Sequence, residues 1–152
     1  MLALLQRVIG ARVIIAEEGS SRIEESGRID RGLLIFLCAQ PEDTEAVVDR
    51  FLQRLLSYRI FADAGGKMNR SVRDVDGGVL LVPQFTLAAD TARGLRPGFS
   101  AAATPELGRR LFDYAWLRLQ QLHRPVACGR FGADMQVTLT NDGPATFWLS
   151  SG

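Results

Sequence analysis

The sequence predicts one domain that combines β-strands with two amphipathic helices. Its 152 residues suit a single domain with a sizeable core, and its hydrophobic fraction of 47% and charged fraction of 23% are those of an ordinary soluble globular protein. Strand-like patterns occupy the beginning, middle and end of the chain, and two segments repeat apolar residues at helical spacing. We therefore expect one domain over residues 1–152, without repeats or linkers.

The first forty residues predict a β meander. Residues 2–15 are rich in β-branched side chains on both sides of a bend at Gly10. Polar turn residues follow at 17–21. The apolar run Leu33–Cys38 is continuous enough to be a strand that is buried on both faces.

Two helices are predicted from their start signals and apolar spacing. The first has Asp43 or Thr44 as its N-cap and apolar residues at helical spacing to about Ser57. The second opens at Thr104, followed by a first-turn proline and an acid, and runs to about Leu122. Their apolar stripes are typical of core-facing helices, not of a cofactor site.

The middle of the chain is rich in turn residues. Gly65-Gly66-Lys67 lacks the glycine spacing and the following helix of a phosphate-binding loop, whereas Asp74–Gly78 predicts a tight hairpin turn. The buried strand at 79–87 contains Pro83, which removes a ladder donor and predicts an edge, a bulge or a strand end. Residues 84–86 then lie in irregular surroundings with free backbone N–H groups, which can bind a carbonyl.

The end of the chain predicts two strands joined by a corner. Residues 134–140 alternate apolar and polar side chains, and a second strand starts at 146–149, with Gly143-Pro144 between them. Both an ordinary turn and a deliberately rigid piece of backbone fit this pair. Shorter strands are expected at 58–61 and 126–128.

Composition limits the partners and the compartment. Lys+Arg 18 against Asp+Glu 17 gives a net charge of +1, so no global positive field gathers long nucleic acids, and we expect no DNA partner. Cys38 and Cys128 lie in apolar runs and predict buried, unpaired thiols, as in a reducing cytoplasm. The N-terminal segment lacks a basic n-region, and the longest apolar run, 33–39, is too short for a bilayer. We expect a soluble cytoplasmic protein.

The residue types leave a site made of backbone dipoles and hydroxyl groups. One histidine and two distant cysteines offer no closely spaced metal ligands, and His123 follows the second helix, where a histidine completes the helix dipole. What remains is Gln84, Thr86 and the carbonyl groups of Gly143 and Pro144. Such groups can orient a reactive ester and stabilise developing charge, but they include no strong general base. We expect no metal and no cofactor.

Six ordered motifs resemble those of the D-aminoacyl-tRNA deacylase family, whose members hydrolyse D-amino acids from mischarged tRNA. They span almost the full length: Leu4-Leu5-Gln6-Arg7-Val8 with Ala11-Arg12-Val13, Gly66-Lys67-Met68-Asn69-Arg70-Ser71-Val72, Gln84-Phe85-Thr86-Leu87, Gly94-Leu95-Arg96-Pro97 with Phe99, Phe131-Gly132-Ala133-Asp134-Met135, and Asn141-Asp142-Gly143-Pro144-Ala145-Thr146.

The resemblance implies an α+β fold in β/β/α layers, with mixed and antiparallel sheets and two main helices, assembled as a homodimer. It implies that Gly143-Pro144 takes the cis form and enters the partner subunit's active site as a chirality filter, beside Arg7. It places the reacting carbonyl at Gln84-Phe85-Thr86 and the terminal adenosine of tRNA near Phe131 and Met135. Two positions depart from the family, which usually has serine in place of Pro83 and Gly98.

The function that the resemblance implies is hydrolysis of D-aminoacyl-tRNA with rejection of L-aminoacyl-tRNA. Because Pro83 removes a serine hydroxyl, Thr86 or the ribose 2′-OH of the tRNA is expected to help activate water. Because glycine has no side chain for the filter to exclude, slow attack on glycyl-tRNA is expected. Two alternatives stay open: a non-catalytic dimer that binds RNA ends, which Pro83 permits, and a purely structural dimer.

Overall fold

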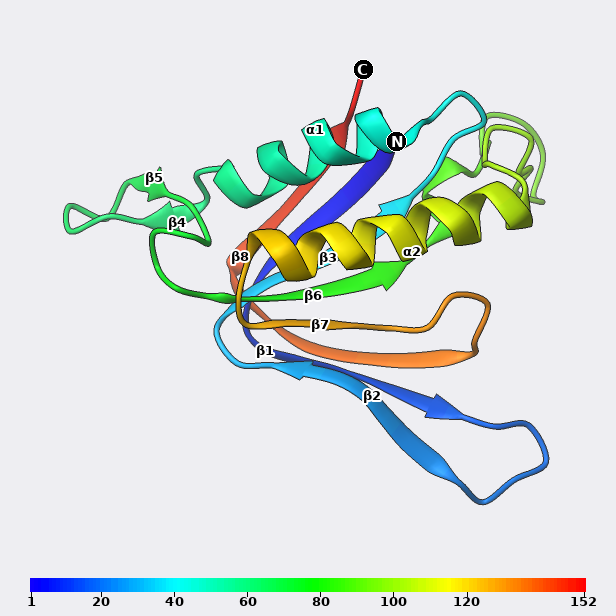
Figure 1. The fold of residues 1–152 in the computed structure, drawn as a ribbon, viewed down its shortest axis with the longest axis horizontal. Coiled ribbons are helices and arrows are strands. Elements are labelled where there is room, and N and C mark those ends of the chain that lie inside the picture. Colours follow the sequence, from blue (N-terminus) through cyan, green and yellow to red (C-terminus); the bar gives the residue numbers. More distant parts are fainter.

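The computed structural model describes residues 1–152 and shows a six-stranded mixed sheet covered by two helices, with a separate two-stranded sheet (Figure 1). The helices are α1 (Glu45–Ser57) and α2 (Pro105–Leu122), and a short 3₁₀ helix, η1, spans Phe85–Ala88. The strands are β1 (Leu2–Ala16), β2 (Ile23–Ile29), β3 (Gly32–Cys38), β4 (Phe61–Ala62), β5 (Met68–Arg70), β6 (Gly78–Pro83), β7 (Val126–Cys128) and β8 (Met135–Ser150).

Strand β1 is the centre of the sheet. Strand β8 pairs antiparallel with β1 over nearly its whole length. The first half of β1 also pairs with β3, and its second half pairs with β2, so β2 and β3 together form one long antiparallel partner. The predicted meander is therefore wrong, because β1 has 15 residues and is long enough to pair with both following strands.

The remaining strands extend the sheet in parallel. Strand β6 pairs parallel with β3, and β7 pairs parallel with β6. Each of these connections carries a helix, as a parallel crossover requires. The sheet then curls until β7 approaches β2, where the Ser26 hydroxyl donates to the Cys128 carbonyl at 3.2 Å. The sheet is thus nearly closed into a barrel.

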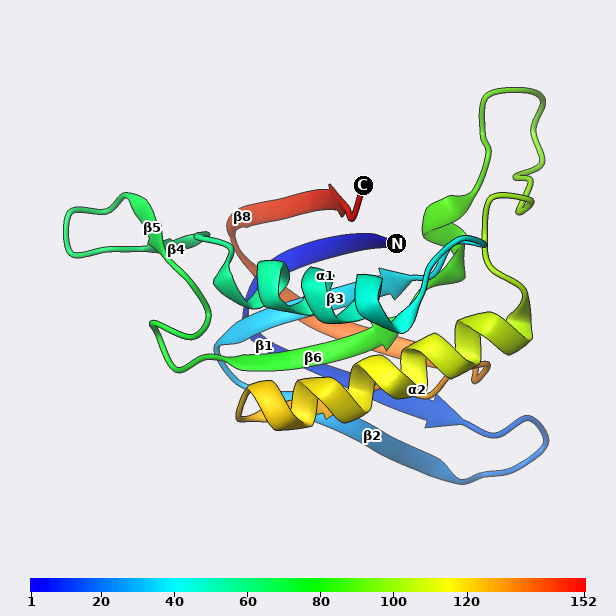
Figure 2. The same ribbon diagram turned by 45° about the horizontal axis from the view of Figure 1, so that its top comes forward.

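Both helices cover the same face of the sheet and lie side by side (Figure 2). Alternate side chains of β3 point to opposite cores: Leu33 and Ile35 pack under the helices, whereas Leu34 packs inside the curled sheet with Leu80 and Val82. This arrangement confirms that β3 is buried on both faces and confirms the α+β layers. No helix combines the length and apolar character that crossing a bilayer requires.

Local signals set the helix boundaries as expected. Thr44 caps α1 and accepts the Val47 amide, and Thr104 caps α2, whose first residue is Pro105. Asp76 takes a positive φ of 52° in the predicted turn. That turn joins no hairpin, because β5 pairs with β4, whereas β6 pairs parallel with β3 in the main sheet.

Candidate functional site

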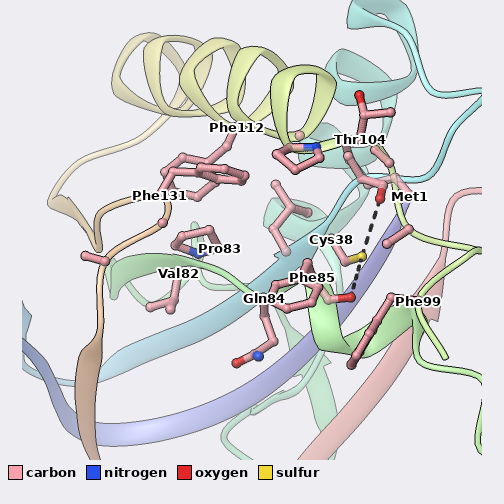
Figure 3. Close-up of a pocket in the computed structure, with 18 of the residues that line it drawn as sticks. Met1, Cys38, Val82, Pro83, Gln84, Phe85, Phe99, Thr104, Phe112 and Phe131 are labelled. Carbon is pink, nitrogen blue, oxygen red and sulfur yellow. Dashed lines mark hydrogen bonds between the residues drawn. The ribbon is translucent and has the colours of Figure 1, made fainter. Parts of the chain in front are cut away.

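A cavity of about 610 Å³ opens where β3 and β6 end and α2 begins (Figure 3). Its walls are mostly apolar and carry no charged side chain. The lining residues are Met1, Leu37, Cys38, Ala39, Val82, Pro83, Gln84, Phe85, Phe99, Ala102, Ala103, Thr104, Pro105, Gly108, Phe112, Phe131, Gly132, Ala133, Met135 and Val137. A site of this kind favours a flat, apolar group over an ion.

Pro83 is the last residue of β6, which confirms the predicted strand end. The Gln84 amide donates to the Leu37 carbonyl at 2.8 Å, so this N–H is not free, contrary to the expectation from sequence. The chain then enters η1. The amides of Phe85 and Thr86 open this helix, and a helix start offers them no preceding carbonyl within the helix.

Thr86 is exposed beside the cavity and does not line it. The side-chain amide of Gln84 donates to the Thr86 hydroxyl oxygen. A hydroxyl that accepts in this way keeps its own proton for another acceptor. Thr86 can therefore donate a hydrogen bond to a group bound at the mouth of the cavity.

Phe131 lines the cavity under α2 (Figure 3), and Met135 also lines it. The Arg109 guanidinium lies 5.1 Å from the Phe131 ring centroid, and the Phe112 ring lies 6.4 Å from it. The Met135 sulfur accepts the Arg130 amide at 3.4 Å. The fold thus brings the residues after β7 to the same cavity as Gln84 and Phe85.

Sequence reasoning missed Cys38, Thr104, Gly108 and Phe112 as cavity residues. Each has an ordinary structural role in sequence, as strand, cap or helix residue, and only its place at the end of an element hints at a site. Burial raises the pKa of the Cys38 thiol, whose sulfur lies 3.5 Å from the Phe85 carbonyl oxygen. Both cysteines are unpaired, as expected.

The corner at Gly143-Pro144 is a bulge within β8. Val8 pairs with Asn141 and Gln6 pairs with Thr146, so residues 142–145 leave the ladder, and β8 continues on the same partner. The prediction of two strands around a corner is corrected to one interrupted strand, because both halves pair with β1. The peptide bond between Gly143 and Pro144 is cis.

Side chains hold this bulge from both sides. The Asn141 amide donates to the Ala145 carbonyl at 3.0 Å, and the Ala145 amide donates to the Asn141 oxygen at 2.8 Å. Arg7 donates to the Asp142 carbonyl at 2.9 Å and to the Ile60 carbonyl at 2.7 Å. The backbone of the bulge is thereby fixed in one shape.

Gly143 has no room for a side chain. Its φ is +145°, and a Cβ atom there would lie 2.8 Å from the Ala145 nitrogen and 2.9 Å from an Arg7 nitrogen. Gly143 and Pro144 are nevertheless exposed to solvent. The bulge therefore presents rigid main chain outward.

The bulge lies away from the cavity in the same chain. Arg7 pairs with Leu33, whereas Leu2 pairs with Cys38 at the cavity. Five residues of extended strand separate these positions, which corresponds to roughly 17 Å. Within one chain, Gly143, Pro144 and Arg7 do not join Gln84 and Phe131.

His123 and the Gly65-Gly66-Lys67 loop are structural. His123 caps the end of α2, as expected, but its ring lies 2.6 Å from the Gly77 carbonyl and does not bind a carbonyl of its own helix. The Asp63 carboxylate accepts the amides of Gly65 and Lys67, each at 2.9 Å, so these amides do not form a phosphate loop. No three His, Cys, Asp or Glu side chains converge as metal ligands.

Comparison with known proteins identifies similar chains over the full length. Residues 4–150 match the family described as D-Tyr-tRNA(Tyr) deacylase. A D-aminoacyl-tRNA deacylase of Pseudomonas fluorescens (strain Pf-5) is 58% identical over 99% of this chain and 100% of the relative. The D-aminoacyl-tRNA deacylase of Herminiimonas arsenicoxydans is 58% identical over 98% and 96%.

Two solved structures share the fold. One, described as the c-Myc DNA Unwinding Element Binding Protein, superposes with a TM-score of 0.90 at 34% identity, over 100% of this chain and 99% of the other. The other is described as a structural analysis of a probable eukaryotic D-amino acid tRNA deacylase. It gives a TM-score of 0.80 at 16% identity, over 97% of each chain, and supports the fold alone.

Proposed function

The chain belongs to the D-Tyr-tRNA(Tyr) deacylase family, and we propose that it hydrolyses the ester bond of D-aminoacyl-tRNA to a free D-amino acid and tRNA. The observation that carries this proposal is the apolar cavity between Phe131 and Phe85. An aromatic-lined cavity suits the unstacked base at a single-stranded RNA end. A terminal adenosine held by Phe131 and Met135 would leave its ester at the mouth, beside Gln84.

The groups at the mouth suit ester hydrolysis without a strong base. Water adds to the carbonyl carbon, negative charge develops on the carbonyl oxygen, and the bond to the ribose oxygen then breaks as that oxygen takes up a proton. We assign the stabilisation of this charge to the amides of Phe85 and Thr86 and to the Thr86 hydroxyl. The walls carry no carboxylate or imidazole, so the activation of water is assigned to Thr86 or the ribose 2′-OH.

The chirality filter is assigned to Gly143 and Pro144 of the partner subunit in a homodimer. The bulge is exposed, fixed by Arg7 and Asn141, and distant from the cavity of its own chain. D- and L-aminoacyl esters carry the same groups, and one contact typically separates substrates by only ~1–3 kcal/mol. Rigid carbonyl groups on the side where an L side chain projects would reject it by shape. Glycyl-tRNA has no side chain to reject and would be attacked slowly.

Single-turnover hydrolysis of D- and L-aminoacyl-tRNA by wild type and Pro144→Ala tests the function. Wild type should release the D-amino acid selectively, and Pro144→Ala should lose most of this selectivity, because alanine does not fix the backbone of the bulge. Gly143→Ala is a poorer test, since its Cβ would clash with the main chain. Unchanged selectivity in a folded Pro144→Ala protein would remove the filter from the bulge.

Thr86→Ala tests the role of the hydroxyl. The variant should lose about tenfold or more in kcat, because a donor to the developing charge is removed. Thr86→Ser is the matched control, as it keeps the hydroxyl and should keep most of the rate. Thr86 is exposed, so neither change should alter the unfolding midpoint. A wild-type kcat for Thr86→Ala would remove Thr86 from the mechanism.

Binding without hydrolysis is the competing function. The relative described as a DNA-element-binding protein favours it, whereas the net charge of +1 gives duplex DNA little attraction. A hydrolysis assay with D-aminoacyl-tRNA and added duplex DNA as a competitor decides between hydrolysis and binding alone. Hydrolysis of D-aminoacyl-tRNA that excess duplex leaves unchanged supports the deacylase, and tight duplex binding with no ester hydrolysis supports the binding protein.

A further inference from the structure

No side chain that lines the cavity carries a positive charge, and the Arg109 guanidinium beside it is stacked over the Phe131 ring. None of its lining side chains is an arginine or a lysine, and the Met1 ammonium that reaches it pairs with Asp43 at 2.8 Å. The phosphates that precede a nucleotide bound in the cavity must therefore lie outside, at its rim. A chain with a net charge of +1 can attract them only through locally placed cations.

A loop that carries two such cations rises at this rim. The Asp90 amide donates to the Gly98 carbonyl at 2.7 Å, and the Gly98 amide donates back at 2.9 Å, which closes the intervening residues into a loop. Figure 2 shows this segment, between η1 and α2, projecting from the body of the molecule. Gly94 at its tip has a φ of +68°, and every residue from 91 to 100 is exposed.

The loop is attached directly to the wall of the cavity. Phe99 follows the loop, lines the cavity, and lies with its ring centroid 5.1 Å from that of Phe85 (Figure 3). Arg96 is three residues before Phe99, and three extended residues span at most about 10 Å. Arg93 is three residues after Asp90, which pairs with Gly98 next to Phe99. By the same span, both arginines start within about 10 Å of the loop's base at the cavity.

Neither arginine has a partner within the protein. Arg93 and Arg96 make no ion pair and no side-chain hydrogen bond, unlike Arg7, Arg118 and Arg130. The acid at the base of the loop, Asp90, accepts the Ala92 amide at 2.9 Å. Arginine binds phosphate through paired N–H groups, so two unpaired guanidinium groups on one short loop are suited to phosphate.

We infer that Arg93 and Arg96 bind the backbone phosphates of the single-stranded tRNA end whose terminal nucleoside occupies the cavity. The inference rests on the proposed function for the nature of that RNA. It assigns these residues to substrate affinity, not to the chemical step.

Equilibrium binding of uncharged tRNA over a series of salt concentrations tests the inference. Arg93→Gln and Arg96→Gln should each weaken binding about threefold to tenfold and lower the salt slope by roughly 0.7 to 0.9. Arg124→Gln is the matched control, because Arg124 is also exposed and unpaired but follows the far end of α2. The 18 residues of α2 place it roughly 27 Å from Thr104. It should change binding by less than about twofold.

A substrate without phosphates separates this inference from the proposed function. The ester 3′-O-(D-aminoacyl)adenosine keeps the reacting bond and the terminal nucleoside. Both arginine variants should hydrolyse it at the wild-type rate, while their half-saturating concentration for D-aminoacyl-tRNA rises and kcat stays unchanged. If Arg93→Gln and Arg96→Gln bind tRNA as tightly as Arg124→Gln does, with the same salt slope, the inference is overturned. Weaker binding by the loop variants with no ester hydrolysis by wild type would support the phosphate contact and reject the proposed function.

Discussion

Asn141 shows how one side chain fixes the backbone of the bulge. Its amide donates to the carbonyl of Ala145 and accepts the amide of the same residue. A side-chain amide offers a donor and an acceptor on neighbouring atoms, which suits this pair of bonds. The residue types at 141–146 indicated a corner, but this pair of bonds follows from how β8 bulges beside Arg7, which no local pattern reveals.

Asn141→Asp tests this support. The carboxylate keeps the acceptor for the Ala145 amide but faces the Ala145 carbonyl without a donor, which should cost about 1–3 kcal/mol of unfolding free energy. Selectivity for D- over L-aminoacyl-tRNA should fall with it. Urea unfolding and single-turnover assays measure the two effects. Gln136→Glu is the control, since it makes the same change at an exposed position of β8; equal effects of both substitutions would contradict the role of Asn141.

At the scale of elements, a polar contact joins the two helices above their shared core. The Asp49 carboxylate of α1 accepts from Arg118 Nε at 2.8 Å and from the Tyr114 hydroxyl at 2.9 Å, both on α2. The hydrogen bond from Arg118 is the main cause that lowers the pKa of Asp49 below its ordinary value of 3.8. The charged form of Asp49 is therefore favoured in the folded protein.

This pKa shift predicts the sign of a pH effect. A lowered pKa in the folded state stabilises the protein above the ordinary pKa of 3.8, and this contribution disappears as the pH falls through the lower folded value. Because the pair is about one third exposed, solvent screening limits its contribution to about 0.5 kcal/mol. Asp49→Asn should remove this part of the acid dependence in unfolding experiments. An identical dependence of the unfolding free energy on pH in both proteins would contradict the assignment.

Elements with local signals were predicted well, and elements defined by their partners were not. The caps Thr44 and Thr104 and the end of β6 at Pro83 follow from backbone chemistry within a few residues. Other features depend on which strands, distant in sequence, are available for pairing. These features are the pairing of β3 with β1 and the absence of a hairpin before β6. These pairings join residues far apart in the chain, and local patterns do not specify them.

At the scale of the whole molecule, the proposed filter and the cavity can meet only across two chains. Within one chain, the bulge and the cavity lie at different positions along β1 and β3. The proposed dimer would supply the bulge of one subunit to the cavity of the other. Each active site would then contain Phe131 of one chain and Pro144 of its partner.

Mixing two variants tests this composite site. Pro144→Ala subunits keep an intact cavity but lose the filter, and Phe131→Ala subunits lose the cavity wall but keep the filter. In mixed dimers with excess Phe131→Ala, the intact cavities should regain selectivity for D-aminoacyl-tRNA, because their filter comes from the other subunit. The ratio of D to L hydrolysis in the mixture measures this effect. Selectivity that stays at the level of Pro144→Ala alone would place the filter in the same chain as the cavity.

The sequence by itself determined the two helices with their caps, the apolar faces, the strand end at Pro83 and the six motifs that resemble a known family. These features follow from φ restrictions, hydrogen bonding and hydrophobic periodicity within a few residues. The tertiary structure alone decided that Phe131 meets Phe85 in one cavity, that Arg7 clamps the bulge, and that the bulge stands apart from the cavity. These relations depend on the pairing of distant strands and on the curl of the sheet, which only the complete chain can establish.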